Sequence, residues 1–167
     1  ELGYETATPI QEKAIPSILA GLDVVGTAQT GTGKTAAFAL PLLQRLMDGP
    51  RGQLRGLILA PTRELAEQIR QSIDRLAIRT GLRCTAIYGG ANLVKQYQIL
   101  RRGVDIVIAC PGRLLDHINR GNINLTQVEV LVLDEADHMF DLGFREPIYK
   151  IIRHLPKKRQ NLLFSAT

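Results

Sequence analysis

The chain has 167 residues, of which 45% are hydrophobic, so it can build one sizeable core and we expect a single domain spanning residues 1–167. Its 21 Lys and Arg residues against 16 Asp and Glu give a net charge of +5, which suits a polyanionic partner without requiring one. No apolar run approaches the roughly 20 residues of a membrane span, and residues 1–4 lack the features of a signal peptide, so we expect a soluble, cytoplasmic protein without a membrane partner.

Apolar runs and helical patterns alternate after residue 20, as expected for an α/β fold with a parallel sheet and helices on both faces. The spacing of apolar residues predicts helices over residues 35–46 and 63–77, the second of them amphipathic. Short apolar runs predict strands over residues 24–27, 56–60, 83–88, 105–110, 128–133 and 160–165. We find no repeat or linker, and the two cysteines, Cys84 and Cys110, lack the paired spacing of a zinc site and are expected to be buried thiols.

A glycine-rich loop lies between the first predicted strand and the helix over residues 35–46. Its glycines allow backbone N–H groups to surround an anion, Lys34 can reach the β and γ phosphates, and Thr35 can hold Mg²⁺. The loop departs from the G-x-x-x-x-G-K-[ST] pattern at Ala28, so a turn that binds nothing is the alternative, which the strand and helix on either side disfavour. The residues expected to bind a nucleoside triphosphate are Ala28, Gln29, Thr30, Gly31, Thr32, Gly33, Lys34 and Thr35.

Acidic residues 134–137 follow the predicted strand over residues 128–133, at the strand end where ligands bind in open α/β sheets. Asp134 is placed to hold Mg²⁺ through water, and Glu135 to orient or deprotonate the attacking water. Acids at such a position can instead cap a helix. We expect the catalytic residues to be Lys34, Asp134 and Glu135, with Thr35 and Asp134 as the metal-binding residues.

Five further motifs lie along the chain, namely Ala7-Thr8-Pro9-Ile10-Gln11, Pro61-Thr62-Arg63-Glu64-Leu65-Ala66, Gly89-Gly90, Cys110-Pro111-Gly112-Arg113 and Ser165-Ala166-Thr167. With these motifs, the phosphate loop and the Asp-Glu-Ala-Asp tetrad, the chain resembles the amino-terminal RecA-like domain of the DEAD-box ATP-dependent RNA helicases over nearly its whole length. Their joint occurrence in the family's order is far more specific than any one of them. The resemblance implies a RecA-like P-loop NTPase fold with ATP and Mg²⁺ as cofactors.

The resemblance also assigns Gln11 to the base of the nucleotide. A side-chain amide can pair with the N7 acceptor and the N6 donor of adenine, which suits selection of ATP over GTP. A polar residue at the start of a helix, with Thr8 as cap and Pro9 in the first turn, is the alternative that we would favour without the resemblance.

Loops after three predicted strands match the family's RNA path. Helix N-termini, glycines and arginines bind phosphate oxygens without distinguishing bases. The resemblance therefore implies single-stranded or duplex RNA, recognised through its backbone, as the partner. The expected RNA-binding residues are Thr62, Arg63, Gly90, Gly112 and Arg113. Solvated surface charge is the alternative for either arginine considered alone. Aromatic residues make up only 5% of the chain, which disfavours a base-stacking platform.

The last motif is expected to couple the state of ATP to RNA binding. In the family, hydrogen bonds join it to the acidic tetrad, which assigns this role to Asp137, Ser165 and Thr167. The chain stops directly after this apolar strand, which indicates an excised domain whose last strand end could be frayed.

Two departures from the family's pattern concern ligand affinity. Cys110 replaces the usual threonine, so one RNA phosphate contact is expected to be weaker, and the aromatic residue that usually stacks on adenine would precede Glu1. The second RecA-like domain, with an arginine finger that contributes about 10³ to 10⁵ in rate in related chemistry, is not part of the chain. We expect a monomeric fragment of very low activity.

The leading functional hypothesis is ATP hydrolysis coupled to RNA duplex unwinding or RNA–protein remodelling. An ATP-dependent RNA clamp with slow hydrolysis is the alternative. An unrelated P-loop enzyme such as a small-molecule kinase is a third, but it leaves residues 61–66 and 110–113 unexplained. The compact motif set favours a bacterial source.

Overall fold

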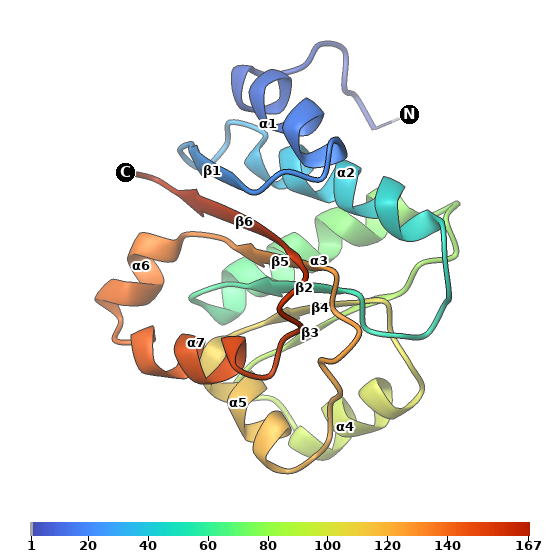
Figure 1. Ribbon diagram of the computed structural model, residues 1–167, viewed down its shortest axis with the longest axis vertical. Coiled ribbons are helices and arrows are strands. Elements are labelled where there is room, and N and C mark those ends of the chain that lie inside the picture. The colour runs from blue at the N-terminus through green and yellow to red at the C-terminus, as the bar shows by residue number, and fades with distance from the viewer. Residues whose placement is uncertain (1) are drawn as a thin grey trace.

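A six-stranded sheet forms the centre of the molecule, which a computed structural model describes over residues 2–167 (Figure 1). Every pair of neighbouring strands is parallel, and the order is β1-β6-β5-β2-β4-β3. The strands are β1 (Val24–Thr27), β2 (Gly56–Leu59), β3 (Cys84–Ile87), β4 (Ile106–Ala109), β5 (Val130–Leu133) and β6 (Gln160–Ser165). The predicted parallel α/β fold is therefore confirmed.

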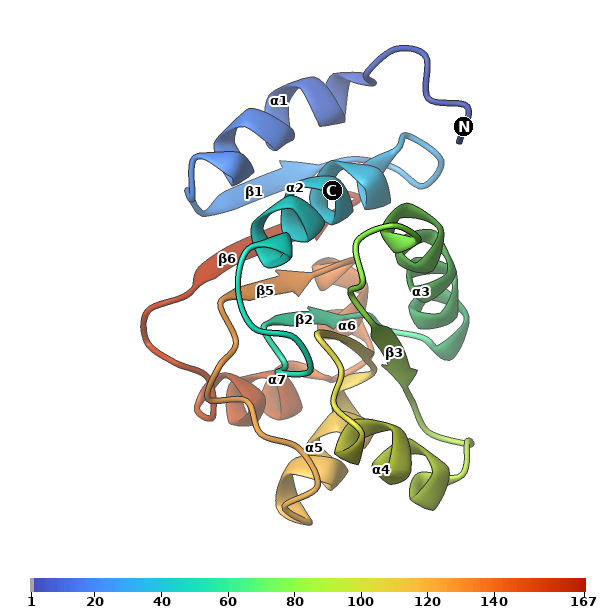
Figure 2. The same cartoon turned by 90° about the vertical axis from the view of Figure 1, so that its right-hand side faces the viewer.

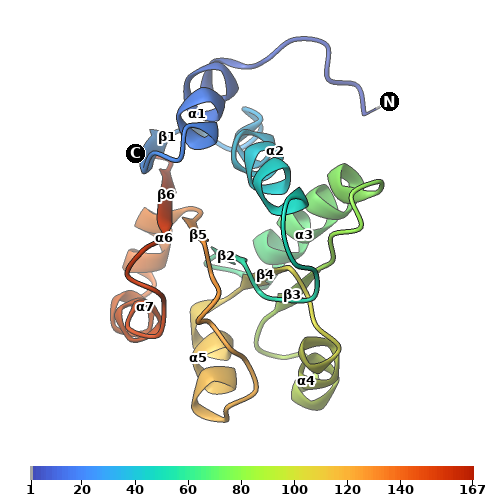
Figure 3. The ribbon, with the colours of Figure 1, turned by 45° about the vertical axis from the view of Figure 1, so that its right-hand side comes forward.

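Helices cover both faces of the sheet, as Figure 3 shows along the strands. The first three pack over one face, and the other four lie on the opposite side. They are α1 (Pro9–Leu19), α2 (Lys34–Met47), α3 (Arg63–Ala77), α4 (Leu93–Arg101), α5 (Pro111–Asn119), α6 (Ala136–Asp141) and α7 (Arg145–Ile152). No helix within residues 2–167 has both the length and the apolar character needed to cross a membrane.

The central strands β2, β4 and β5 are buried at every residue, since helices cover them on both sides. This explains why they consist of continuous apolar runs instead of alternating ones. The predicted helices over 35–46 and 63–77 are confirmed, the second at both ends. Four predicted strands are shorter than expected. In β2, for example, Ala60 still donates to Ala109 O at 3.0 Å, but Pro61 has no N–H to continue the ladder.

The strand order divides the sheet into two halves, and Figure 2 shows β1, β6, β5 and β2 following one another in this sequence. One half contains β1, β6 and β5, and the other contains β2, β4 and β3. Because all strands are parallel, the loops at their carboxyl ends share one edge of the sheet. Most of the predicted site residues follow these strand ends.

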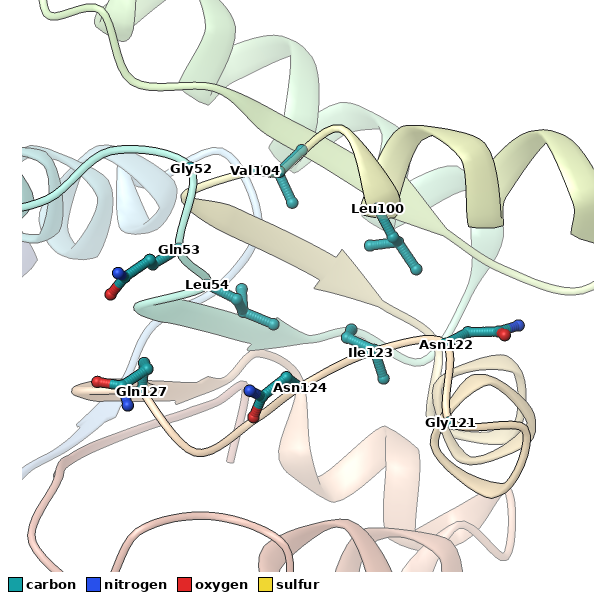
Figure 4. A pocket seen from close by; sticks show the side chains of 11 residues that line it. Gly52, Gln53, Leu54, Leu100, Val104, Gly121, Asn122, Ile123, Asn124 and Gln127 are labelled. Atoms are coloured by element: carbon teal, nitrogen blue, oxygen red, sulfur yellow. The ribbon is translucent and has the colours of Figure 1, made fainter.

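The opposite edge of the sheet carries a cavity of about 570 Å³ (Figure 4). It lies at the amino ends of β2 and β4, where Leu54 and Val104 line it together with Asn122 and Ile123 from the segment after α5. None of the predicted site residues lines this cavity.

Helix α1 is attached to the sheet through Gln160, whose side chain is 3% exposed. Its Nε2 donates to Ile18 O at 3.0 Å and to Leu22 O at 2.6 Å, while its Oε1 accepts from Arg45 Nη1 at 3.0 Å. These bonds join the end of α1 and Arg45 of α2 to β6, on the half of the sheet that carries the phosphate loop.

We predict that Gln160→Leu lowers the free energy of unfolding by about 1–3 kcal/mol, because buried partners lose their hydrogen bonds. Urea denaturation measures the change. Gln44→Leu is the matched control, since Gln44 is exposed on α2 and its side chain makes no hydrogen bond within residues 2–167. Equal effects of the two substitutions would contradict the prediction.

Candidate functional site

The phosphate loop runs between β1 and α2, in the predicted strand–loop–helix context. Gly31 and Gly33 have φ angles of 80° and 82°, a region that residues with a Cβ rarely occupy. A Cβ at Gly33 would also lie 2.5 Å from Nε2 of Gln11. Gly33 directly precedes α2, so the first N–H groups of this helix are available to bind an anion.

Gln11 lies against this loop although 22 residues separate it from Gly33. Its side chain is 5% exposed, its Nε2 donates to Gly33 O at 3.1 Å, and its Oε1 accepts from Thr8 N at 3.0 Å. The amide retains one N–H and one lone pair for a further partner. No pattern in the sequence indicates the contact with Gly33, because only the fold brings α1 and the phosphate loop together.

Lys34 and Asp134 form a buried ion pair, with Nζ 2.8 Å from Oδ1 and side chains 6% and 0% exposed. Burial raises the pKa of Asp134 above its usual range, although the ammonium group of Lys34 opposes the shift. The second carboxylate oxygen, Oδ2, is buried and has no hydrogen-bond partner within residues 2–167. Such an oxygen, with the Thr35 hydroxyl in the first turn of α2, fits the oxygen ligands that Mg²⁺ prefers.

Glu135 is the only residue other than glycine with a positive φ within residues 2–167, at φ 52° and ψ 51°. This left-handed conformation costs free energy and often occurs at functional sites. It places Glu135 directly before α6, and its Oε2 lies 3.3 Å from Nδ1 of His138. Nothing in the sequence indicated the strained backbone.

The predicted coupling residues lie together. Thr167 Oγ1 donates to Asp137 Oδ2 at 3.2 Å, and the Thr167 N–H donates to Ser165 Oγ at 3.3 Å. Desolvation alone would raise the pKa of Asp137, but the hydroxyl groups of Ser165 and Thr167 favour the charged form and the pKa is lowered. The Ala28 N–H also donates to Ser165 O at 2.9 Å, so this cluster adjoins the phosphate loop.

The loops expected to bind RNA follow β2, β3 and β4, on the other half of the same edge. Thr62 caps α3, where its Oγ1 accepts from Leu65 N at 3.2 Å and its O–H remains able to donate. The guanidinium of Arg63, an exposed residue, lies 5.0 Å from the centre of the Tyr88 ring. A Cβ at Gly90 would be 3.9 Å from Arg63 Nη1, so these two predicted residues are neighbours.

Gly112 and Arg113 lie in the first turn of α5. Gly112 is exposed, and a Cβ there would meet no atom within 4 Å. Arg113 is half-buried and donates from Nη1 to Ala91 O at 2.9 Å and to Gln96 Oε1 at 3.0 Å. It is therefore not a solvated surface charge, and the fold attaches it to the segment that follows Gly90.

The fold and the loop together define a RecA-like α/β domain with a phosphate loop. The sequence matches the DEAD/DEAH box helicase family over residues 8–167, and the chain belongs to this family. A crystal structure of a DEAD box protein from Methanococcus jannaschii is similar to it, with a TM-score of 0.93, 42% identity, and coverage of 99% of this chain and 45% of that one. The match includes residues 61–66 and 110–113, which a small-molecule kinase would leave unexplained.

Curated relatives come from different kingdoms. The chain is 49% identical over 166 residues to the ATP-dependent RNA helicase CshA of Listeria monocytogenes, covering 99% of this chain and 32% of that protein. It is 52% identical over 167 residues to the ATP-dependent rRNA helicase rrp3 of Emericella nidulans, covering 99% of this chain and 36% of that protein. The chain thus spans about a third of the length of these relatives, and the bacterial source stays a prediction.

We predict opposite pH dependences for Asp134→Asn and Asp137→Asn. The pKa of Asp134 is raised in the folded state, so the folded state binds its proton more tightly than the unfolded state does. The wild type therefore loses stability as the pH rises from the usual aspartate value of 3.8 through the raised value. The Asp134→Asn variant lacks this loss, so its free energy of unfolding relative to wild type increases with pH, by at most about 1.4 kcal/mol per pH unit.

For Asp137 the sign reverses. Its lowered pKa stabilises the folded state above the usual value of 3.8, and this contribution disappears as the pH falls through the lowered value. Relative to wild type, the Asp137→Asn variant therefore becomes less stable as the pH rises through that window. Urea denaturation of both variants at a series of pH values, without nucleotide, tests the pair, and parallel slopes would refute it.

Proposed function

We propose that the chain is the ATP-binding domain of an RNA helicase that couples ATP hydrolysis to RNA duplex unwinding or RNA–protein remodelling. The observation that carries the proposal is the division of one sheet edge between two sets of loops. The phosphate loop and the acidic tetrad follow β1 and β5, and the arginine and glycine loops follow β2, β3 and β4. The printed names of the relatives, ATP-dependent RNA helicases, support the same activity.

The nucleotide would lie along the first set of loops. Gln11 uses its remaining N–H and lone pair on adenine, and residues 28–35 surround the phosphates with backbone N–H groups. Thr35 and Asp134 would hold Mg²⁺, which when bound neutralises charge on the β and γ phosphates.

Hydrolysis would use the two charged groups of the Lys34–Asp134 ion pair. Lys34 turns from Asp134 Oδ1 toward the phosphates, since a triphosphate offers it a stronger negative partner. Glu135, held in position by its unusual backbone conformation, orients or deprotonates the attacking water. These roles make Lys34, Asp134 and Glu135 the catalytic residues.

RNA would bind along the second set of loops through its phosphates. The Thr62 hydroxyl, the guanidinium groups of Arg63 and Arg113, and the exposed backbone at Gly90 and Gly112 supply the donors. Asp137, Ser165 and Thr167 then couple the two halves, since their cluster adjoins the phosphate loop.

The rest of the protein would complete the site. Because the chain spans about a third of its relatives, we propose that a second RecA-like domain contributes further RNA contacts and an arginine finger. The isolated domain is accordingly proposed to be monomeric and to hydrolyse ATP very slowly, whereas the full-length protein is stimulated by RNA.

We predict that Glu135→Gln in the full-length protein lowers RNA-stimulated ATPase activity by at least about 10²-fold, because a water-activating group is lost. ATP binding is expected to persist. A phosphate-release assay with and without RNA, beside nucleotide titration, measures both properties. Glu146→Gln is the control, since Glu146 is exposed on α7 and makes no side-chain hydrogen bond within residues 2–167.

The same assay, together with a duplex-unwinding assay and the lifetime of ATP-dependent RNA binding in the full-length protein, separates the alternatives. A wild-type protein that RNA does not stimulate, or that a small metabolite stimulates instead, would refute the helicase proposal. A protein that binds RNA durably with ATP but does not separate duplexes would be the RNA clamp with slow hydrolysis.

Gln11→Ala is predicted to reduce the preference for ATP over GTP about 10- to 100-fold, since two hydrogen bonds of roughly 0.5–1.5 kcal/mol each are lost. The ratio of the two dissociation constants is the relevant readout, because loss of the Gly33 contact weakens both nucleotides equally. Gln44→Ala provides the control. An unchanged ratio would remove Gln11 from base recognition.

A further inference from the structure

A buried polar cluster between α4 and α5 has no part in the proposed nucleotide chemistry. Gln96 is the one buried residue of α4, with 7% of its side chain exposed, and His117 in α5 is 0% exposed. Polar groups lose hydration when they are buried and need hydrogen-bond partners in return. Gln96 and His117 find these partners in each other, in Tyr88 O, in Arg113 and in Asn122.

The orientation of the Gln96 amide follows from its neighbours. Its Nε2 donates to Tyr88 O at 3.0 Å, and its Oε1 accepts from Arg113 Nη1 at 3.0 Å. A guanidinium only donates and a carbonyl oxygen only accepts. With the amide reversed, its NH₂ would face the Arg113 guanidinium, donor against donor, and its oxygen would face Tyr88 O, acceptor against acceptor. Gln96 therefore presents its oxygen to Arg113.

The protonation of His117 follows in turn. Its Nε2 lies 3.1 Å from Gln96 Oε1, which only accepts, so the proton is on Nε2. Its Nδ1 lies 3.1 Å from Asn122 Nδ2 and accepts from that amide. Burial, together with the charge of Arg113, lowers the pKa of His117 and agrees with a neutral ring.

Both hydrogens of Arg113 Nη1 are used within the protein, one on Ala91 O at 2.9 Å and one on Gln96 Oε1. The Nε and Nη2 donors make no hydrogen bond within residues 2–167. These two nitrogens share one edge of the guanidinium, the arrangement that binds two phosphate oxygens at once. Arg113 is thus fixed on one side and open to a phosphate on the other.

We propose that Gln96 and His117 are positioning residues for Arg113 in binding the RNA backbone. The inference rests on the RNA-binding role proposed for Arg113. An arginine held in place before binding loses less conformational freedom when it contacts a phosphate. The same bonds attach α5 to the loop after β3. They therefore fix the position of the loop after β4 relative to the loop after β3, the two loops proposed to bind RNA here.

The test uses the full-length protein that contains this domain. Its affinity for a fluorescent single-stranded oligouridylate, with a non-hydrolysable ATP analogue, is measured by anisotropy at several salt concentrations. The variants are Arg113→Ala, Gln96→Met and the double variant. Gln98→Met is the matched control, since Gln98 is exposed on the same helix and its side chain makes no hydrogen bond within residues 2–167.

We expect Arg113→Ala to weaken RNA binding roughly 10-fold and to reduce the slope of log affinity against log salt by about 0.7, the contribution of one phosphate contact on a single strand. Gln96→Met is expected to weaken RNA binding about 3- to 10-fold and to leave the affinity for the ATP analogue unchanged. In the double variant Gln96→Met adds nothing further, because it acts through Arg113. Gln98→Met leaves RNA binding unchanged.

Two failures are distinguishable. If Arg113→Ala binds RNA with wild-type affinity and salt slope, the RNA-binding role of Arg113 is wrong and the inference falls with it. If Arg113→Ala weakens binding but Gln96→Met does not, or if the two losses add in the double variant, positioning is refuted while the proposed function stands.

A second pair of variants guards against a Gln96→Met protein that does not fold. His117→Gln can donate from its amide to Gln96 Oε1 and is expected to keep RNA affinity within about 2-fold of wild type, whereas His117→Leu cannot donate and loses it as Gln96→Met does. Melting temperatures are recorded for both variants. An RNA affinity that follows the melting temperature, and not the presence of the donor, would overturn the proposal.

Discussion

Parallel pairing of all six strands is the constraint on which the other features depend. It brings every strand's carboxyl end to one edge, and the order β1-β6-β5-β2-β4-β3 then decides which loops become neighbours. Three adjacent strands carry the phosphate loop, the acidic tetrad and the last motif, and the other three carry the arginine and glycine loops. A single rigid sheet therefore supports both groups, and β5 and β2 are the paired strands at which they meet.

The ion pair between Lys34 and Asp134 shows how such an edge can hold buried charge. Two buried charges are costly to remove from water, and here each compensates the other at 2.8 Å. The compensation is incomplete, because burial still raises the pKa of Asp134 and one of its oxygens has no partner within residues 2–167. A cation at that oxygen and an anion at Lys34 would satisfy both groups, which is the combination that a nucleotide with its metal ion supplies.

Two buried glutamines have comparable roles on the two halves of the edge. Gln11 joins α1 to the phosphate loop through Gly33, and Gln96 joins α4 to Arg113 and to Tyr88 O. A carboxamide donates and accepts at once, so it can connect two backbones or side chains without adding charge. In both places the amide lies beside residues proposed to bind phosphate or base.

The sequence alone determined the six strands, the helices over residues 35–46 and 63–77 and the residue types of the loops, because apolar periodicity, glycine spacing and the Lys-Thr and acidic runs are local signals. The six strands and the helix over 63–77 could be derived from them, and the assignment of Lys34 to the phosphates and of Asp134 to Mg²⁺ stays a prediction. Only the tertiary structure decided that Lys34 pairs with Asp134, that Glu135 has a left-handed backbone, and that Gln96 and His117 hold Arg113. These contacts join residues distant in the chain or depend on backbone geometry, and strand order, which no local pattern encodes, brings them about.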